Sequence, residues 1–143
     1  MHASDTICRH SISDGRYSPM PDYEEITMKY LFILNDPPYG TERSYNALRL
    51  ALALTKSEAD TLAVFLIGDA ASCAVEGQAT PSGYYNLERM LKALAAKGSQ
   101  IGVCGTCMDA RGIKAESLVE GAHRSSMDEL TAWTREADKV LVF

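Results

Sequence analysis

The chain has 143 residues, of which 46% are hydrophobic and 23% charged, as in an ordinary soluble protein with one domain. Its net charge of -5 at pH 7 argues against nucleic acid as a partner, because affinity for the phosphate backbone comes from clustered Lys and Arg. No apolar run approaches the ~20 residues that cross a bilayer, and residues 1–27 lack the apolar centre of a secretory signal. We therefore expect a cytoplasmic protein with no membrane partner.

The composition changes near Met28. Residues 1–27 are rich in Ser, Asp and Pro and show neither helix nor strand periodicity, which is typical of a disordered extension. From Met28 onward, apolar runs alternate with helical patterns. The sequence therefore predicts a disordered N-terminal extension over residues 1–27 and one folded α/β domain over residues 28–143.

In chain order, the predicted elements are a strand at 30–34, a helix at 41–56, a strand at 62–67, a helix at 85–97, a strand at 101–103, a helix at 126–137 and a strand at 140–143. The strand segments are apolar without polar alternation, which suits strands covered on both faces. The helical segments repeat apolar residues at i, i+3 and i+4, and Ser126 and Gly98 are expected helix caps.

Residues 114–125 show a weaker pattern, which predicts a short turn of helix and a short extra strand. Strands that alternate with helices are typical of right-handed crossovers. The fold class predicted is therefore α/β, with a doubly wound, mainly parallel sheet of about five strands and helices on both faces.

Chemistry in such a sheet gathers at the carboxyl ends of the strands. Asp36 and Tyr39 follow the first predicted strand, Asp69 follows the second, and Cys104 follows the third. We therefore treat Asp36, Tyr39 and Asp69 as candidate binding residues beside Cys104. Two of them have structural alternatives, because Tyr39 lies in a Pro- and Gly-containing loop before a helix and Asp69 is able to cap the next helix.

Cys104 and Cys107 are three positions apart, and such a pair has several roles in proteins. A structural zinc site usually takes four Cys or His ligands in two short-spaced pairs, whereas this sequence has one such pair, so no metal is predicted. A thioredoxin-like dithiol places its first cysteine at the start of a helix, where the thiolate is stabilised. Simple packing is the alternative, above all for Cys107, since free Cys is often buried.

A single nucleophilic thiolate at Cys104 is the role that we favour. Gly105 allows backbone amides to turn toward the sulfur, and Arg111 offers a positive charge that lowers a thiol pKa. Asp109 is expected to orient Arg111 or to transfer a proton. No His lies close in sequence as a general base, which disfavours protease-type acyl transfer and favours sulfur or disulfide exchange.

Five stretches of the chain also match a known family. They are PYGTERSYNALRLALAL (38–54), FLIGDA (65–70), GYYNLERML (83–91), VCGTCMDARGI (103–113) and ADKVLVF (137–143). Through them, residues 28–143 resemble the DsrE/DsrF-like family, most closely its small YchN-like branch. The resemblance implies a flavodoxin-like fold, a ring-like homo-oligomer (a hexamer), and a part in sulfur relay.

The resemblance also implies roles for the cysteines. Cys104 would accept a persulfide and pass it on, as a sulfurtransferase-like carrier rather than a turnover enzyme, and Cys107 is a candidate resolving thiol. Sulfur donor and acceptor proteins are then the expected partners, and no cofactor is predicted. Two alternatives stay open: a thiol–disulfide oxidoreductase that uses Cys104 and Cys107, and a non-catalytic oligomeric binding module. The loop after the first strand lacks a GxGxxG fingerprint, which weakens the second alternative.

Overall fold

The computed structural model describes residues 12–13, 16–17 and 27–143. In the N-terminal part, β1 (Ile12–Ser13) and β2 (Arg16–Tyr17) pair as two antiparallel strands. Apart from these short strands and residue 27, the predicted disordered extension over residues 1–27 lies outside the described residues.

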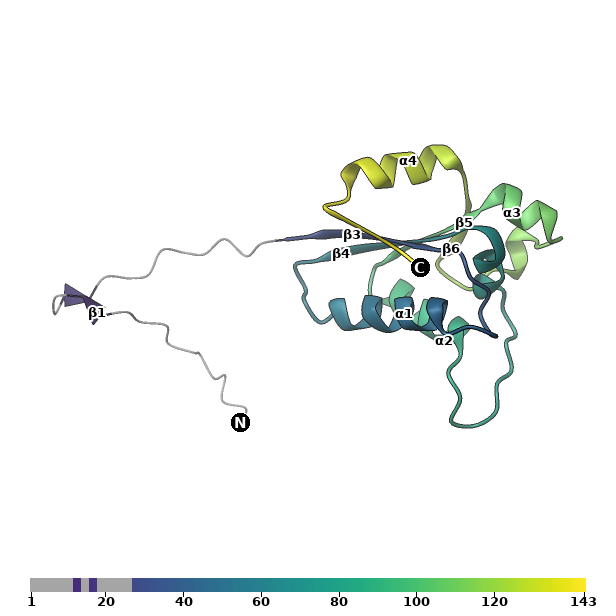
Figure 1. Cartoon of the computed structure of the whole chain (residues 1–143), viewed down its shortest axis with the longest axis horizontal. Coiled ribbons are helices and arrows are strands. Elements are labelled where there is room, and N and C mark those ends of the chain that lie inside the picture. The colour runs from purple at the N-terminus through teal and green to yellow at the C-terminus, as the bar shows by residue number, and fades with distance from the viewer. Residues whose placement is uncertain (1–11, 14–15, 18–26) are drawn as a thin grey trace.

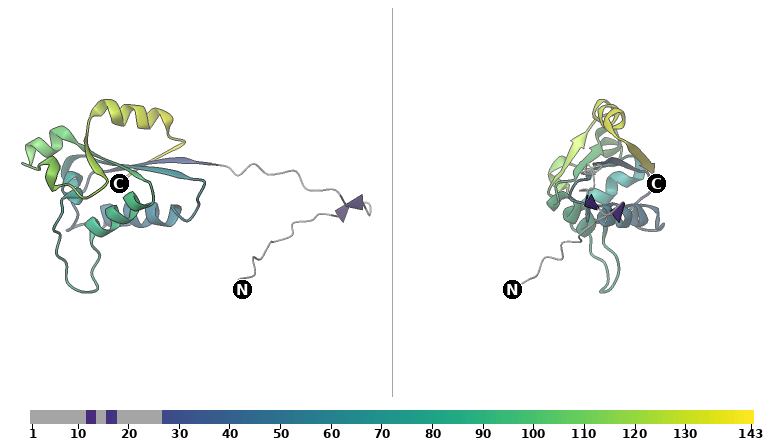
Figure 2. Two further views of the ribbon diagram at one scale, coloured as in Figure 1. Left: turned by 180° about the vertical axis from the view of Figure 1, so that it is seen from behind. Right: turned by 90° about the vertical axis from the view of Figure 1, so that its left-hand side faces the viewer.

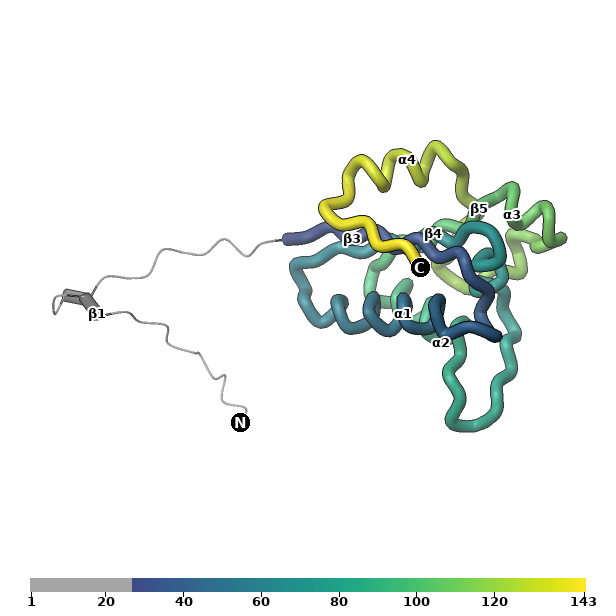
Figure 3. The backbone as a smooth tube through the Cα atoms, in the orientation of Figure 1, coloured from purple at the N-terminus to yellow at the C-terminus, as the bar shows by residue number. Residues whose placement is uncertain are grey.

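The domain is built on a five-stranded sheet in the order β6-β5-β4-β3-β7, and every neighbouring pair in it is parallel. The strands are β3 (Lys29–Leu34), β4 (Thr61–Leu66), β5 (Gln100–Cys104), β6 (Ala122–Ser125) and β7 (Lys139–Val142). The chain adds strands in one direction from β3 to β6 and then crosses back to place β7 beside β3. In the backbone trace of Figure 3, the yellow C-terminal segment runs beside β3. The predicted α/β fold class with a mainly parallel sheet is confirmed.

Helices cover the two faces of the sheet unequally (Figures 1 and 2). The longer helices are α1 (Arg43–Leu54), α2 (Leu87–Ala96) and α4 (Met127–Glu136), and the shorter ones are α3 (Gly105–Ala110) and the 3-10 helices η1 (Gly68–Ala74) and η2 (Ala115–Ser117). α1 and α2 lie on one face, and α4 lies on the other. Because right-handed crossovers fix the side of each connection, the reversal between β6 and β7 sends α4 to the opposite face.

Local signals explain where these helices begin. Ser126 caps α4 as predicted, since its Oγ accepts from the Glu129 N–H at 3.3 Å. Asn86 caps α2 by accepting from the Arg89 N–H at 3.0 Å, so α2 begins two residues later than the predicted 85. The helix predicted from residue 41 begins at Arg43 instead: the Thr41 hydroxyl donates to Asp36 at 2.9 Å, and the N-cap residue of α1 makes no side-chain cap hydrogen bond to the first N–H groups of the helix.

Two clusters of buried side chains hold the domain together. The larger one fills the space between the sheet and α1, α2 and η1, and includes Phe32, Leu48 and Leu91. The smaller one lies on the α4 face and consists of Leu31, Phe65, Cys104 and Leu130. Burying one such Leu or Phe side chain contributes about 1.5–3 kcal/mol. Cys104 therefore stands on the face of the sheet that the smaller cluster covers.

In the part of the chain that the structure describes, the helices lack the combination of length and apolarity needed to cross a membrane.

Candidate functional site

The two cysteines lie where β5 ends and α3 begins. Cys104 is the last residue of β5 and the residue before the first turn of α3, so its side chain stands at the carboxyl edge of the sheet. Cys107 lies in the first turn of α3, half-buried between the two hydrophobic clusters. Both are free thiols. The two cysteines that are three positions apart in the sequence therefore lie together at the carboxyl edge of the sheet.

Cys104 is surrounded by groups that favour its thiolate. Its Sγ lies 3.3 Å from the Thr106 hydroxyl oxygen. Burial raises the pKa of the Cys104 thiol, but hydrogen bonds from the Cys107 thiol, the Thr106 hydroxyl and the N–H groups of both residues outweigh it, and the pKa lies below its ordinary value. The residue is 6% exposed, so little of its surface is open to an incoming group.

Cys107 has the opposite electrostatic character. Burial and the hydrogen bond to Cys104 raise the pKa of the Cys107 thiol, while the Gly68 N–H and the charge of Arg111 lower it less. The Gly68 N–H donates to Cys107 Sγ at 3.1 Å. Gly68 adopts a φ of +61°, the left-handed region that glycine enters without strain. Of the two thiols, Cys104 is therefore the more acidic, and Cys107 keeps its proton to higher pH.

Arg124 supplies a positive charge beside Cys104. Its guanidinium lies over Gly105, where an added Cβ would come within 2.9 Å of Arg124 Cζ, and the negative charge of Cys104 contributes to the raised Arg124 pKa, after the larger effect of Asp109. Two hydrogen bonds, at 2.8 and 2.7 Å, join the guanidinium to the two carboxylate oxygens of Asp109. The expectation that Asp109 orients Arg111 is therefore wrong.

The Arg111 side chain does not pair with Asp109, and it contacts Cys107 where the sequence predicted an effect on Cys104. Its guanidinium pairs with Asp69 at 2.6 Å and donates to the backbone carbonyl of Cys107 at 3.0 Å. Its charge therefore acts on Cys107 and not, as the sequence suggested, chiefly on Cys104. Asp69 does reach the site from the end of β4, but as the partner of this arginine. Each cysteine thus has an arginine–aspartate pair beside it.

Asp36 and Tyr39, the other predicted binding residues, are engaged in the loops over α1 and α2. The Asp36 carboxylate accepts from Thr41 and lies 3.6 Å from the Arg43 guanidinium. The Tyr39 hydroxyl donates to Gln78 at 2.7 Å and accepts from the Leu87 N–H at 3.3 Å. These contacts stabilise the loops, and the structure does not join either side chain to the cysteines.

Strand β6 brings further polar side chains to the thiolate side. Ser125 pairs with Cys104 in the register of β5 and β6, and its hydroxyl donates to Glu129. His123 Nε2 lies 2.8 Å from the same carboxylate oxygen. Burial raises the Glu129 pKa, but the bonds from Ser125 and His123 outweigh it and keep the pKa below its usual range. This cluster anchors the start of α4 beside Cys104.

Sequence reasoning missed Arg124, Ser125 and Gly68 as site residues. Arg124 and Ser125 lie in a segment where a short extra strand was predicted, and a parallel strand next to β5 has to end near Cys104. Alignment of this predicted strand with the strand that ends at Cys104 would have placed both residues near the thiol. Gly68 was visible only as the residue before Asp69, and its N–H reaches Cys107 through the η1 turn that the sequence did not predict.

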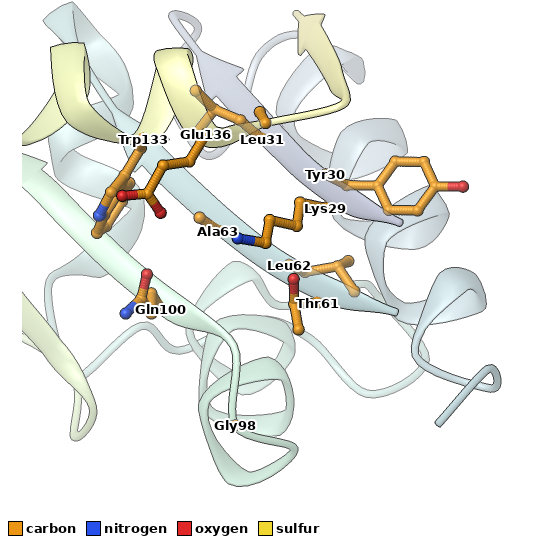
Figure 4. Close-up of a pocket in the computed structure, with 11 residues that line it drawn as sticks. Lys29, Tyr30, Leu31, Thr61, Leu62, Ala63, Gly98, Gln100, Trp133 and Glu136 are labelled. Atoms are coloured by element: carbon orange, nitrogen blue, oxygen red, sulfur yellow. The ribbon is translucent and has the colours of Figure 1, made fainter. Parts of the chain in front are cut away.

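A cavity of about 310 Å³ lies at the opposite edge of the sheet, beneath the end of α4. Lys29, Thr61 and Gln100, at the starts of three strands, border it together with Trp133 and Glu136 (Figure 4). The cysteines stand at the other ends of these strands, so this cavity is separate from the thiol chemistry. Among the described residues, no group of three or more His, Cys, Asp or Glu side chains is arranged to hold a metal ion.

Known proteins match the folded domain closely. Residues 28–143 match the sequence model of the DsrE/DsrF-like family. Protein YchN of Escherichia coli K12 is 40% identical over 116 residues, which cover 80% of this chain and 98% of that protein. The uncharacterized protein MJ0989 of Methanocaldococcus jannaschii is 39% identical over 116 residues, with 81% and 100% covered. The crystal structure of E. coli YchN superimposes with a TM-score of 0.77 at 39% identity, covering 81% of this chain and 99% of that one.

Proposed function

The chain belongs to the DsrE/DsrF-like family through residues 28–143, and we propose that it is a sulfur carrier that accepts and passes on a persulfide at Cys104. The observation that supports this most is the division of roles between the two thiols. Cys104 has a lowered pKa and Cys107 a raised one, so one sulfur is prepared for attack and its neighbour is not. The protein is then a carrier that holds a reactive sulfur between two partners.

The loading step is a thiol exchange. The Cys104 thiolate attacks the outer sulfur of a persulfide on a donor protein, a bond forms between the two sulfurs, and the donor cysteine leaves as a thiolate. In the unloading step, the thiolate of an acceptor attacks the outer sulfur held on Cys104, and Cys104 leaves as a thiolate. Each step moves one sulfur atom with no change in its oxidation state, so neither needs a cofactor.

The polar surroundings of Cys104 suit both steps. The Thr106 hydroxyl and the nearby Arg124 charge stabilise a negative sulfur, whether it is the attacking thiolate or the leaving one. The low exposure of Cys104 limits the access of water and small oxidants to the loaded sulfur. A protein partner is the expected donor because it can position its own persulfide against a thiol that is only 6% exposed.

We also propose that the carrier works as a homo-oligomer, with a hexamer as the expected state, in the cytoplasm, where thiols stay reduced. Val140 and Val142 on the edge strand β7 are 40% and 62% exposed. They pair with Leu31 and Ile33 of β3 and thus extend the apolar α4 face of the sheet. A second copy of the chain would cover this surface, which light scattering at micromolar concentration tests.

Intact-mass spectrometry tests the carrier function. The protein is incubated with a cysteine desulfurase and cysteine, desalted, and weighed without reductant, in a Cys8→Ser background that leaves the three thiols of the described domain. We expect the mass of one added sulfur atom, lost on treatment with a dithiol. Cys104→Ser should abolish the gain, and Cys73→Ser, the matched control at a buried thiol, should retain it. Equal gain in Cys104→Ser would contradict the proposal.

A thiol–disulfide oxidoreductase is the second candidate, favoured by the placement of Cys104 at the N-cap of α3 and of Cys107 in its first turn. The two functions differ in their need for Cys107. An oxidoreductase loses turnover of a disulfide substrate in Cys107→Ser, whereas a carrier retains sulfur loading at Cys104.

A further inference from the structure

We infer that Cys107 discharges the carrier: it attacks the persulfide on Cys104, releases the outer sulfur as hydrosulfide, and leaves a Cys104–Cys107 disulfide. The inference rests on the proposed persulfide at Cys104. It adds an activity to the site, the release of sulfide when no acceptor protein collects the sulfur.

The placement of the two thiols permits the attack. Cys104 immediately precedes α3 and Cys107 lies in its first turn, and the Cys107 thiol is close enough to lower the Cys104 pKa as a hydrogen-bond donor. A small movement of this turn brings the sulfurs within bonding range, as in other Cys-x-x-Cys pairs. Cys107 is only half-buried, so its side chain has room to move toward Cys104.

Cys107 also has contacts that a merely packed cysteine does not need. The Gly68 N–H points at its sulfur from the η1 turn, at 3.1 Å. The Arg111 guanidinium binds its carbonyl oxygen and is held there by Asp69. These groups come from two different elements, η1 and the end of α3, and both favour a negative charge on Cys107.

Loading Cys104 changes the balance at Cys107. In the unloaded carrier, the hydrogen bond to Cys104 and the charge on Cys104 help burial to raise the Cys107 pKa. A persulfide places its negative charge on the outer sulfur, one bond farther from the position that Cys104 Sγ occupied. The groups that face Cys107 are then the Gly68 N–H and Arg111, and both lower its pKa. Burial still raises the Cys107 pKa, but loading weakens the part of the effect that comes from Cys104. The geometry around Gly68 and Arg111 then favours the attack by Cys107 more in the loaded state than in the unloaded one.

The discharge balances without an external oxidant. The Cys107 thiol passes its proton to the outer sulfur of the persulfide anion and its own sulfur attacks Cys104 Sγ. The bond between Sγ and the outer sulfur breaks, and the protonated outer sulfur leaves as HS⁻ with both bonding electrons. The outer sulfur is reduced to sulfide, and the two cysteines are oxidised to a disulfide. A small thiol or a dithiol reductant of the cytoplasm then reopens the disulfide by thiol exchange and returns the carrier to its starting state.

The test follows a loaded carrier without any acceptor. The full chain in the Cys8→Ser background is loaded with a cysteine desulfurase and cysteine and then desalted. A sulfide-selective electrode records released sulfide while intact mass and a non-reducing peptide map record the sulfur content and the disulfide. The starting protein is compared with Cys107→Ser and Cys107→Ala, and Cys73→Ser serves as the control.

We expect the starting protein and Cys73→Ser to release one sulfide for each disulfide formed. Both Cys107 variants should keep the added sulfur on the order of tenfold longer or more, since they lack the intramolecular thiol. Equal lifetimes in all proteins, or sulfide release without the disulfide, would overturn the inference while leaving the carrier function intact. Failure of every protein to gain sulfur would instead overturn the carrier function.

Discussion

Arg124 is expected to be the residue whose charge activates Cys104, and Arg124→Gln tests this. A positive charge within about 4–6 Å of a thiol lowers its pKa by about 1–3 units. Solvent and the pairing with Asp109 weaken the effect on Cys104, because the Arg124 side chain is 45% exposed and 2.7 Å from the Asp109 carboxylate. We expect alkylation of Cys104 by iodoacetamide at pH 7 to slow about three- to tenfold in Arg124→Gln.

The pH dependence gives the sign of the effect. Removal of the positive charge raises the Cys104 pKa. At each pH below that pKa a smaller fraction of Cys104 is thiolate, so the profile of rate against pH moves to higher pH. Above both pKa values the two proteins should react at the same rate. The assay is iodoacetamide labelling across pH, followed by peptide mapping, in the Cys8→Ser background.

Two further variants complete this test. Arg111→Gln removes an equal charge that the structure directs to Cys107, so Cys104 labelling should change little. Arg124→Gln alone also leaves the Asp109 carboxylate without its partner. The double variant Arg124→Gln with Asp109→Asn removes both charges, and comparison with the single variant shows how much of the slower labelling comes from the unpaired Asp109 charge. If Arg111→Gln slows Cys104 labelling more than Arg124→Gln does, the assignment of the two arginines is wrong.

Three other expectations concern single contacts. Gly105→Ala should slow Cys104 alkylation without lowering the melting temperature, because its Cβ displaces the flexible Arg124 side chain at 2.9 Å while alanine favours the helix; an unchanged rate would argue against the Arg124 position. Asn86→Ala should cost about 0.5–2 kcal/mol in urea unfolding through loss of the α2 cap alone, and Asn86→Asp should restore the cap but not the full stability, because the Nδ2 bond to the Gln78 carbonyl is lost as well; full stability in Asn86→Asp would show that the cap is the only contribution. Glu129→Gln should flatten the loss of melting temperature below about pH 4, because a carboxyl with a lowered folded pKa stabilises the fold above its unfolded pKa and loses that effect as pH falls; an identical acid profile would show that Glu129 is not coupled to folding.

Much of the fold was predictable from local pattern. The runs YLFIL and LAVFLI lack polar alternation, and they became the central strands β3 and β4. Ser126 was recognised as a cap because a helix start needs a side-chain acceptor close in sequence. The η1 helix was not predicted, since the stretch GDAASCA is too short and too rich in small residues to show a 3.6-residue period.

The site was predictable only in part. Cys104 could be placed because it follows an apolar strand, and strand ends are where parallel sheets gather their chemistry. The partners of the two arginines could not be placed, because sequence proximity suggested Asp109 with Arg111. The pairing of β5 with β6 brings Arg124 to Asp109 across 15 positions, and the end of β4 brings Asp69 to Arg111 across 42. Such contacts depend on the sheet order, which no local pattern contains.

The location of the sulfur on the loaded protein tests the central claim most directly. Trypsin cleavage after Lys97 and Arg111 yields one peptide that contains both Cys104 and Cys107. After loading by a cysteine desulfurase and alkylation, fragmentation of this peptide shows which cysteine holds the added sulfur. We expect the alkylated persulfide on Cys104 and an ordinary alkylated thiol on Cys107. Added sulfur on Cys107 alone, or on neither cysteine, would contradict the account.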